Sequence, residues 1–127
     1  MIIEINTQST TTICDQLRNQ IVLGIAAKRL VPDEPLPSAR NLAADLGINY
    51  HTVMKAYSAL CDEGYIVIDR RKGAMVAQTV SSDDKFISKL SHTLLLASAE
   101  AVCRDMSKDE FTKLCVDCYQ KSKGAES

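Results

Sequence analysis

Residues 49–64 read NYHTVMKAYSALCDEG, and this stretch decides the fold. It predicts a single helix, because Asn49 is a favourable N-cap and Gly64 can take the left-handed conformation that ends a helix. Apolar residues recur at helical spacing on one face, and polar residues occupy the opposite face. The apolar face comprises Val53, Ala56, Tyr57 and Leu60, and the polar face comprises His51, Lys55 and Ser58. We expect the apolar face to pack on a core and the polar face to meet solvent or a partner.

A shorter helix is predicted immediately before this one. Ser38 is its N-cap, Leu42 and Leu46 are its apolar residues, and Gly47 closes it. Two helices joined by so short a glycine-containing turn predict a helix-turn-helix. Upstream, residues 30–37 hold all three prolines and interrupt the chain, since proline lacks the backbone N–H that a helix needs.

The N-terminal part predicts another helix, over about residues 13–28, with Thr10 or Thr11 as its N-cap. Its apolar stripe follows an i, i+4 rhythm. The stripe consists of Ile13, Leu17, Ile21 and Ile25. Residues 2–5 are expected to form a short strand or an ordered arm.

A small β-hairpin is predicted after Gly64. Residues 65–69 (YIVID) are rich in β-branched and aromatic side chains, and residues 74–78 (AMVAQ) form a weaker strand pattern. The turn between them is Arg70-Arg71-Lys72-Gly73. A basic hairpin directly after a helix-turn-helix is a wing. Residues 1–80 are therefore predicted to form a winged helix-turn-helix domain, mainly α with a small β-hairpin.

The remaining residues, 81–127, predict a two-helix hairpin. After a polar linker over residues 79–85, Ser82 is the expected cap of a long helix, and Ser107-x-x-Glu110 is a capping box that opens the last helix. Two helices of this size cannot enclose an independent core. We therefore expect a homodimer in which each hairpin covers the other. The expected dimerisation residues are Phe86, Leu90, Leu94, Leu95, Ala97, Ala101, Phe111 and Leu114.

Composition sets further bounds. The chain has 127 residues, 46% of them hydrophobic, which suits one compact domain with a small appendage. No apolar run reaches the length of a membrane span, and the N-terminus lacks the features of a signal peptide. The five cysteines are odd in number, so we expect reduced thiols and a cytoplasmic protein with no membrane contact. The net charge of −1 gives no general attraction to nucleic acid.

The run LPSARNLAADLGINYHTVMKAYSALCDEGYIV, residues 36–67, resembles the DNA-binding domain of the GntR family of bacterial transcription regulators, as does ICDQLRNQI upstream. The Asn-x-x-Thr-Val-x-Lys-Ala-Tyr pattern, followed by only two helices, is most similar to the YtrA subfamily. The resemblance implies a dimeric regulator, usually a repressor, that binds an inverted-repeat DNA operator. In this subfamily the gene often lies beside those of an ABC transporter.

The resemblance and the predicted fold together select the candidate DNA contacts. Arg40 is carried over from the family's Ser-x-Arg motif, and the wing departs from the family's Gly-x-Gly-Thr by reading Arg71-Lys72-Gly73-Ala74. The candidates are Ser38, Arg40, Asn49, Tyr50, His51, Thr52, Lys55, Arg70, Arg71, Lys72 and Gly73. Several have a structural alternative: Ser38 is a cap alone, Tyr50 is a core residue, and the arginines and lysines are solvated surface.

The remaining motifs point away from a metal site or an enzyme. Cys115-x-x-Cys118 is a single pair on a helix, so buried structural thiols are expected rather than a metal site, and His92 has no ligand partner at suitable spacing. No catalytic or phosphate-binding motif is present, so we expect neither an enzyme nor a cofactor. A winged-helix module that binds a protein instead of DNA is the main alternative. An unidentified small-molecule effector is a third, although two helices leave little room for a pocket of about 300 Å³.

Overall fold

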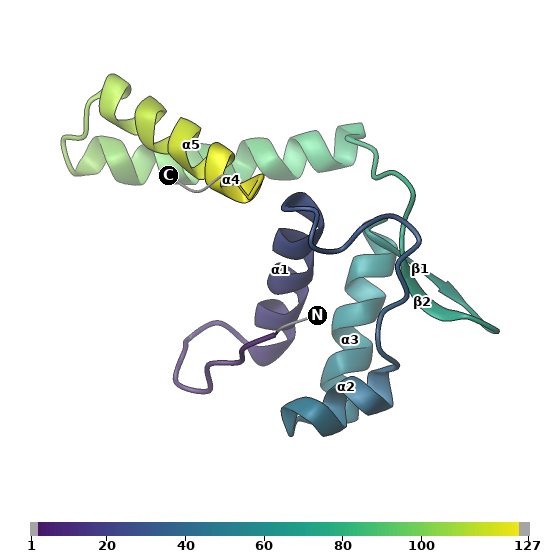
Figure 1. The fold of residues 1–127 in the computed structure, drawn as a ribbon. Coiled ribbons are helices and arrows are strands. Elements are labelled where there is room, and N and C mark those ends of the chain that lie inside the picture. The colour runs from purple at the N-terminus through teal and green to yellow at the C-terminus, as the bar shows by residue number, and fades with distance from the viewer. Residues whose placement is uncertain (1–2, 125–127) are drawn as a thin grey trace. The chain divides into compact units, whose positions relative to one another are not determined.

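The computed structural model describes residues 3–124, and the chain divides into two compact units, Met1–Val80 and Ser81–Ser127 (Figure 1). The elements in order are α1 (Ile13–Ala26), α2 (Ala39–Leu46), α3 (Tyr50–Asp62), β1 (Ile66–Asp69), β2 (Gly73–Val76), α4 (Asp84–Cys103) and α5 (Lys108–Ser122). The predicted fold class is confirmed: a winged helix-turn-helix is followed by two helices. None of the described helices combines the length and apolar character needed to span a membrane.

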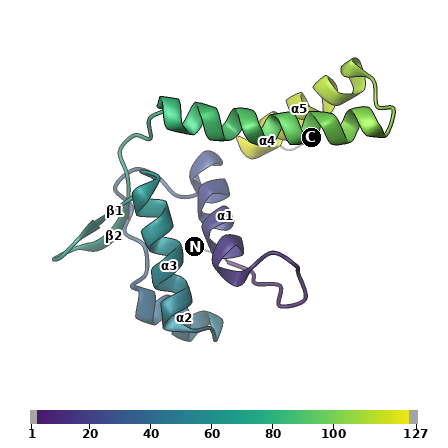
Figure 2. The same ribbon diagram turned by 180° about the vertical axis from the view of Figure 1, so that it is seen from behind.

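The first unit is built around α3. Both ribbon views place α3 between α1 and the β1–β2 hairpin, and α2 lies beside the N-terminal end of α3 (Figures 1 and 2). Leu17 and Ile21 of α1 are fully buried, as are Val53 and Leu60 of α3. Burial of a side chain of this size contributes about 1.5–3 kcal/mol. The apolar back of α3, predicted from residues 49–64, therefore forms the centre of the core.

Side-chain caps define where the helices begin. The hydroxyl oxygen of Ser38 accepts from the Asn41 N–H at 3.1 Å, and Oδ1 of Asn49 accepts from the His51 N–H at 2.8 Å. Both caps agree with the sequence. The cap of α1 is Thr12, not Thr10 or Thr11.

Two glycines shape the ends of these helices. Gly47 ends α2 with a φ of 67°, as its sequence position predicts. α1 ends at Ala26, two residues earlier than expected, and Lys28 then adopts a φ of 61°. Leu30 folds back over the buried Gly24, where an added Cβ would lie 3.0 Å from a Leu30 methyl carbon. A side chain at position 24 would make a tight contact with the Leu30 side chain, which would have to shift by a few tenths of an ångström.

Residues 3–6 form an ordered arm and not a strand, and Ile2 lies outside the described residues. The side-chain amide of Gln16 both donates to and accepts from the backbone of Asn6, at 2.9 and 2.8 Å. Gln20, one helical turn further on, pairs with the backbone of Glu4 in the same way. Two glutamines on one face of α1 thus satisfy the backbone groups of the extended arm.

The wing is a two-stranded antiparallel sheet in which Asp69 pairs with Gly73 and Ile66 with Val76. Residues 33–36 lie along the other edge of β2, where the Leu36 N–H donates to the Ala74 carbonyl at 2.8 Å. An isolated bridge joins Pro35 to Met75 in the same segment. The proline-rich stretch, expected only to interrupt a helix, also protects one edge of the wing.

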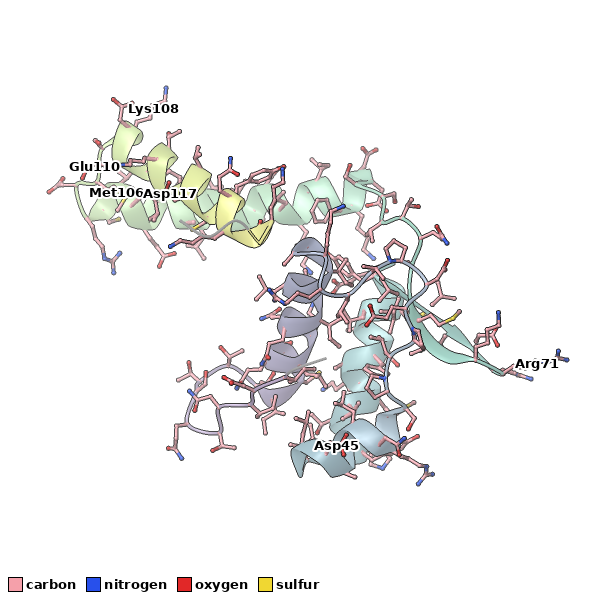
Figure 3. The ribbon with its side chains drawn as sticks, viewed as in Figure 1. Asp45, Arg71, Met106, Lys108, Glu110 and Asp117 are labelled. Carbon is pink, nitrogen blue, oxygen red and sulfur yellow. The ribbon has the colours of Figure 1, made fainter. Side chains whose placement is uncertain are left out.

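The second unit is a helical hairpin. Its long helix is capped by Asp83, which accepts from the Phe86 N–H at 2.8 Å, so the expected cap at Ser82 is wrong by one residue and the linker is shorter than predicted. The capping box of Ser107 and Glu110 is confirmed, with both hydrogen bonds at 3.0 Å. Figure 3 labels Glu110 near the loop end of this hairpin.

Candidate nucleic-acid interface

The outward face of α3 is polar and accessible. His51, Lys55 and Ser58 are all exposed, as the helical spacing predicts. Met54 is also 38% exposed and lies one turn after His51. Sequence reasoning did not select Met54, although its spacing of three residues from His51 was the available signal. The face therefore offers hydrogen-bond donors together with one flexible apolar side chain.

Two candidates from different helices, Arg40 and His51, lie beside the aromatic ring of a third, Tyr50. The guanidinium carbon of Arg40, in the first turn of α2, lies 4.9 Å from the centroid of the Tyr50 ring. The ring centroids of Tyr50 and His51 are 5.5 Å apart with their planes inclined at 65°. Tyr50 is half-buried and packs against the core, whereas Arg40 and His51 are exposed. The core packing expected as the alternative for Tyr50 is therefore observed, and its contact with DNA stays a prediction.

The capping residues keep donors available for a ligand. Ser38 and Asn49 use a side-chain oxygen to accept from the backbone, and both are exposed. A serine hydroxyl that accepts can still donate its hydrogen, and the asparagine NH₂ group is separate from the oxygen used in the cap. Thr52 is half-buried and is less accessible than Ser38 and Asn49. Capping and contact with a phosphate are therefore compatible at Ser38 and Asn49.

The positive charge of Lys55 interacts with the start of α1. The pKa of the Cys14 thiol is raised, mainly because the thiol is partly buried and further because Asp15 is near, and the charge of Lys55 opposes this rise. Lys55 itself is exposed. Its ammonium group is thus available on the outer surface of α3, on the side facing the start of α1.

The wing tip is a basic turn held by one carboxylate. Oδ1 of Asp69 accepts from the backbone N–H groups of Arg71 and Lys72, at 2.7 and 3.1 Å, and these bonds lower the pKa of that carboxyl. Arg70, Arg71 and Lys72 are exposed, and Figure 3 shows Arg71 at the far tip of the hairpin. Gly73 has a φ of 77° and open space around it, so its backbone conformation requires glycine.

The candidate DNA contacts therefore form two groups within the first unit. Ser38, Arg40, Asn49, Tyr50 and His51 come together at the first turns of α2 and α3, and Lys55 continues along α3. The basic residues of the wing form the second group at the hairpin tip (Figures 1 and 3). Such an arrangement can donate hydrogen bonds and place positive charge at two points along a polyanion.

The second unit leaves most of its apolar side chains uncovered. Of the expected dimerisation residues, Ala101 is buried and Ala97 and Phe111 are half-buried. The exposed ones are Phe86, Leu90, Leu94, Leu95 and Leu114, and Ile87, Leu96, Val102, Val116 and Tyr119 are exposed as well.

The expected burial of Cys115 and Cys118 is wrong within the single chain, because both are exposed. The physical reason is that two helices cover each other along one seam and supply no further layer. All five cysteines lie in the described part of the chain and are free thiols. Among the described residues, no three His, Cys, Asp or Glu side chains are grouped so as to hold a metal ion.

Known proteins resemble this chain over most of its length. The model of the bacterial regulatory proteins of the gntR family matches residues 9–76. The uncharacterized HTH-type transcriptional regulator YhcF of Bacillus subtilis is 30% identical over 88 residues, covering 69% of this chain and 73% of YhcF. The pyridoxine biosynthesis regulator PdxR of Corynebacterium glutamicum is 38% identical over 74 residues, which are 58% of this chain but only 16% of PdxR.

Solved structures extend the likeness to the second unit. A transcriptional antiterminator from Listeria monocytogenes EGD-e superposes with a TM-score of 0.91 at 26% identity, over 100% of this chain and 96% of that one. YtrA from Sulfolobus acidocaldarius, a GntR-family transcription factor, gives a TM-score of 0.67 at 38% identity, over 78% of this chain and 99% of YtrA.

Proposed function

The chain belongs to the gntR family of bacterial regulatory proteins, and on that basis we propose that it is a YtrA-like transcriptional regulator that binds operator DNA. The observation that carries the proposal is the polar outward face of α3, which is flanked by Arg40 in α2 and by the basic wing tip. An α-helix fits the major groove, and side chains of its first turns can reach base edges there. We place α3 in that groove.

The contacts divide by chemistry. His51, Lys55 and Met54 face outward from α3, and a methionine there could lie against a thymine methyl group while the polar side chains donate to bases or phosphates. The basic turn of Arg70, Arg71 and Lys72 would lie on the adjacent backbone or minor groove. Local positive charge thus serves binding although the net charge is −1.

We further propose that the protein acts as a homodimer. The second unit exposes a large apolar surface on α4 and α5, and a leucine such as Leu94 is 47% exposed. Apolar patches of this extent on a small unit are typical of interaction sites. A second copy is the simplest occupant, because a two-fold dimer would present two α3 helices to the half-sites of an inverted repeat.

The finer assignments rest on the resemblance to the YtrA subfamily. They are repression and control of an ABC transporter operon. Residence in the cytoplasm is proposed instead from the odd number of cysteines. A small-molecule effector would have to bind at the dimer interface, because the hairpin alone is too thin for a pocket. Transcript levels of the genes flanking this one, measured with and without the gene, test this level of the proposal. Increased expression of a neighbouring transporter on deletion is expected, and unchanged expression contradicts it.

The DNA-binding proposal is tested by fluorescence anisotropy with the gene's own upstream region. A shuffled duplex of the same length and composition is the matched control, at an ionic strength of about 0.15 M. We expect at least about 100-fold tighter binding to the upstream region than to the shuffled duplex. Equal binding to both duplexes, or none to either, contradicts sequence-specific regulation through this region.

One observation favours the alternative of a protein-binding module. Val67 and Ile68 on β1 are 49% and 50% exposed, and apolar side chains of this kind are common in protein interfaces. Replacing both with threonine preserves the β-branched shape and removes part of the apolar surface. If DNA recognition is the function, these variants bind the upstream duplex as the wild type does. Loss of a protein partner with no DNA binding by the wild type would favour the alternative.

A further inference from the structure

We propose that Tyr50 is a positioning residue that holds Arg40 and His51 ready for DNA, so that its main role is not to read a base. This inference deepens the proposed DNA-binding function and depends on it. Arg40 belongs to the first turn of α2, whereas Tyr50 and His51 open α3. One aromatic ring therefore links the two helices of the helix-turn-helix at the surface that would face the duplex.

The Arg40 guanidinium lies over the ring of Tyr50. Their separation of 4.9 Å lies within the range of about 6 Å in which a guanidinium is attracted to an aromatic face. Within residues 3–124, the Arg40 guanidinium makes no hydrogen bond or ion pair with another residue. Its N–H donors are therefore available, while the ring restricts where the group can go. A positioned arginine with unused donors suits bidentate contact with phosphate or guanine.

The Tyr50 residue is itself held by the core. It is half-buried and packs against the hydrophobic core of the first unit. Its backbone is the first residue of α3, directly after the Asn49 cap, whose Oδ1 accepts from the His51 N–H at 2.8 Å. The ring thus has a core-packed side and a surface side. Only a fixed ring can restrict a mobile arginine.

His51 lies edge-to-face with Tyr50. Its ring meets that of Tyr50 at 5.5 Å and 65°, an edge-to-face arrangement that aromatic pairs favour. His51 is exposed, so its ring nitrogens can reach solvent or DNA. Tyr50 consequently contacts two donor-bearing side chains at once, one from each helix.

The consequence is pre-organisation. A free arginine or histidine side chain on the surface loses rotamer freedom when DNA binds, and this loss weakens the complex. Arg40 and His51 are already restricted by the ring, so less freedom remains to be lost. A lysine at position 40 would be restricted less by the Tyr50 ring, because its ammonium lacks the planar group that stacks on aromatic rings. The effect thus depends on the pairing of arginine with an aromatic ring.

A double-mutant cycle tests the proposal with the full chain and the gene's upstream duplex. The variants are Tyr50→Leu, Arg40→Ala and the two combined, and Tyr50→Phe keeps the ring while removing the hydroxyl. We expect Tyr50→Leu to weaken binding about 3- to 10-fold in the wild-type background. In the Arg40→Ala background the same change should weaken binding clearly less than it does in the wild-type background, because only the positioning of His51 remains to be lost. Tyr50→Phe should bind as the wild type does.

Each other outcome identifies a different role. An equal loss from Tyr50→Leu with and without Arg40 means that Tyr50 does not act through Arg40, and it overturns the proposal. A loss with Tyr50→Phe as large as that with Tyr50→Leu means a direct contact by the hydroxyl, and it also overturns the proposal. No binding of the wild type to duplex DNA overturns the proposed function and this inference together.

A second measurement does not require DNA. Protons on the Arg40 side chain should show a ring-current shift in the NMR spectrum, and Tyr50→Leu should abolish it while Tyr50→Phe preserves it. The amide spectrum of the same variants shows whether the first unit stays folded. A normal, unshifted Arg40 side chain in the folded wild type would overturn the positioning role even if Tyr50→Leu weakened DNA binding.

Discussion

The hydroxyl of Tyr57 donates a hydrogen bond to the carbonyl oxygen of Pro37, 2.7 Å away. The ring of Tyr57 lies in the core, and only 3% of the residue is exposed. The bond ties the middle of α3 to the residue that precedes the Ser38 cap of α2. It therefore sets the entry of the chain into the helix-turn-helix, and the sequence pattern gave no indication of this partner.

Replacing Tyr57 with phenylalanine should lower the free energy of unfolding by about 1 kcal/mol, because the hydrogen bond is lost and the Pro37 carbonyl is left without its donor. Urea unfolding followed by circular dichroism measures this change. Tyr119→Phe is the matched control, since Tyr119 is exposed on α5. A loss as large in the control as in Tyr57→Phe would contradict a specific role for this bond.

The same group predicts behaviour at high pH. Burial raises the pKa of Tyr57 to about 12, from an ordinary value of 10.0. Since the neutral phenol is favoured in the folded state, its contribution to stability is complete below about pH 10 and is lost as the pH rises toward about 12. Absorbance titration of wild type and Tyr57→Phe should show one phenol that ionises late only in the wild type. Simultaneous ionisation of all tyrosines near pH 10 would contradict its burial.

Much of the first unit could be predicted because its signals are local. The caps at Ser38 and Asn49, the glycine stop at Gly47 and the buried face of α3 all follow from residue type and helical spacing. The pairing of residues 33–36 with β2 could not be predicted in this way, because it depends on tertiary contacts of a stretch whose prolines point only to irregular structure.

The site was predicted less completely than the fold. Spacing identified the outward residues of α3, but it could not bring Arg40 to the ring of Tyr50, because those residues lie on different helices. The exposure of Cys115 and Cys118 was missed because helical spacing shows a shared apolar side but not whether another layer covers it. Such coverage depends on the assembly.

Arg40→Ala should weaken binding to every duplex by a similar factor if Arg40 contacts a phosphate. The slope of log affinity against log salt should then become shallower by about one. Arg29→Ala is the matched control, because Arg29 is another exposed arginine of the first unit that lies outside the helix-turn-helix. Loss at a single base pair only, with an unchanged slope, would instead indicate that Arg40 reads a base.

Asp69→Ala should loosen the wing tip. The carboxylate accepts from the N–H groups of Arg71 and Lys72, so both amides should exchange with solvent faster in the variant. In the wild type these bonds lower the pKa of Asp69 below its ordinary value of 3.8. The wing tip is therefore fully ordered above the ordinary pKa of Asp69, and this order is lost as the pH falls through the lowered pKa. Amide exchange rates unaffected by the substitution would contradict this role.

The dimer proposal predicts a clear change in mass. Leu90→Glu combined with Leu94→Glu places two charges on the exposed apolar surface of α4, and burying them in an interface would be unfavourable. Light scattering should give twice 13.9 kDa for the wild type and 13.9 kDa for the variant. Lys113→Glu, an exposed change on α5, should leave the dimer intact. A monomeric wild type contradicts the proposal.

The central claim is that DNA lies against the first turns of α2 and α3 and against the wing. The most direct test is an NMR titration of the labelled protein with the upstream duplex, followed through its backbone amides. We predict the largest shifts at residues 38–41, 49–58 and 70–73. Shifts confined to residues outside these segments, or no shifts at a DNA excess sufficient for binding, would contradict the account.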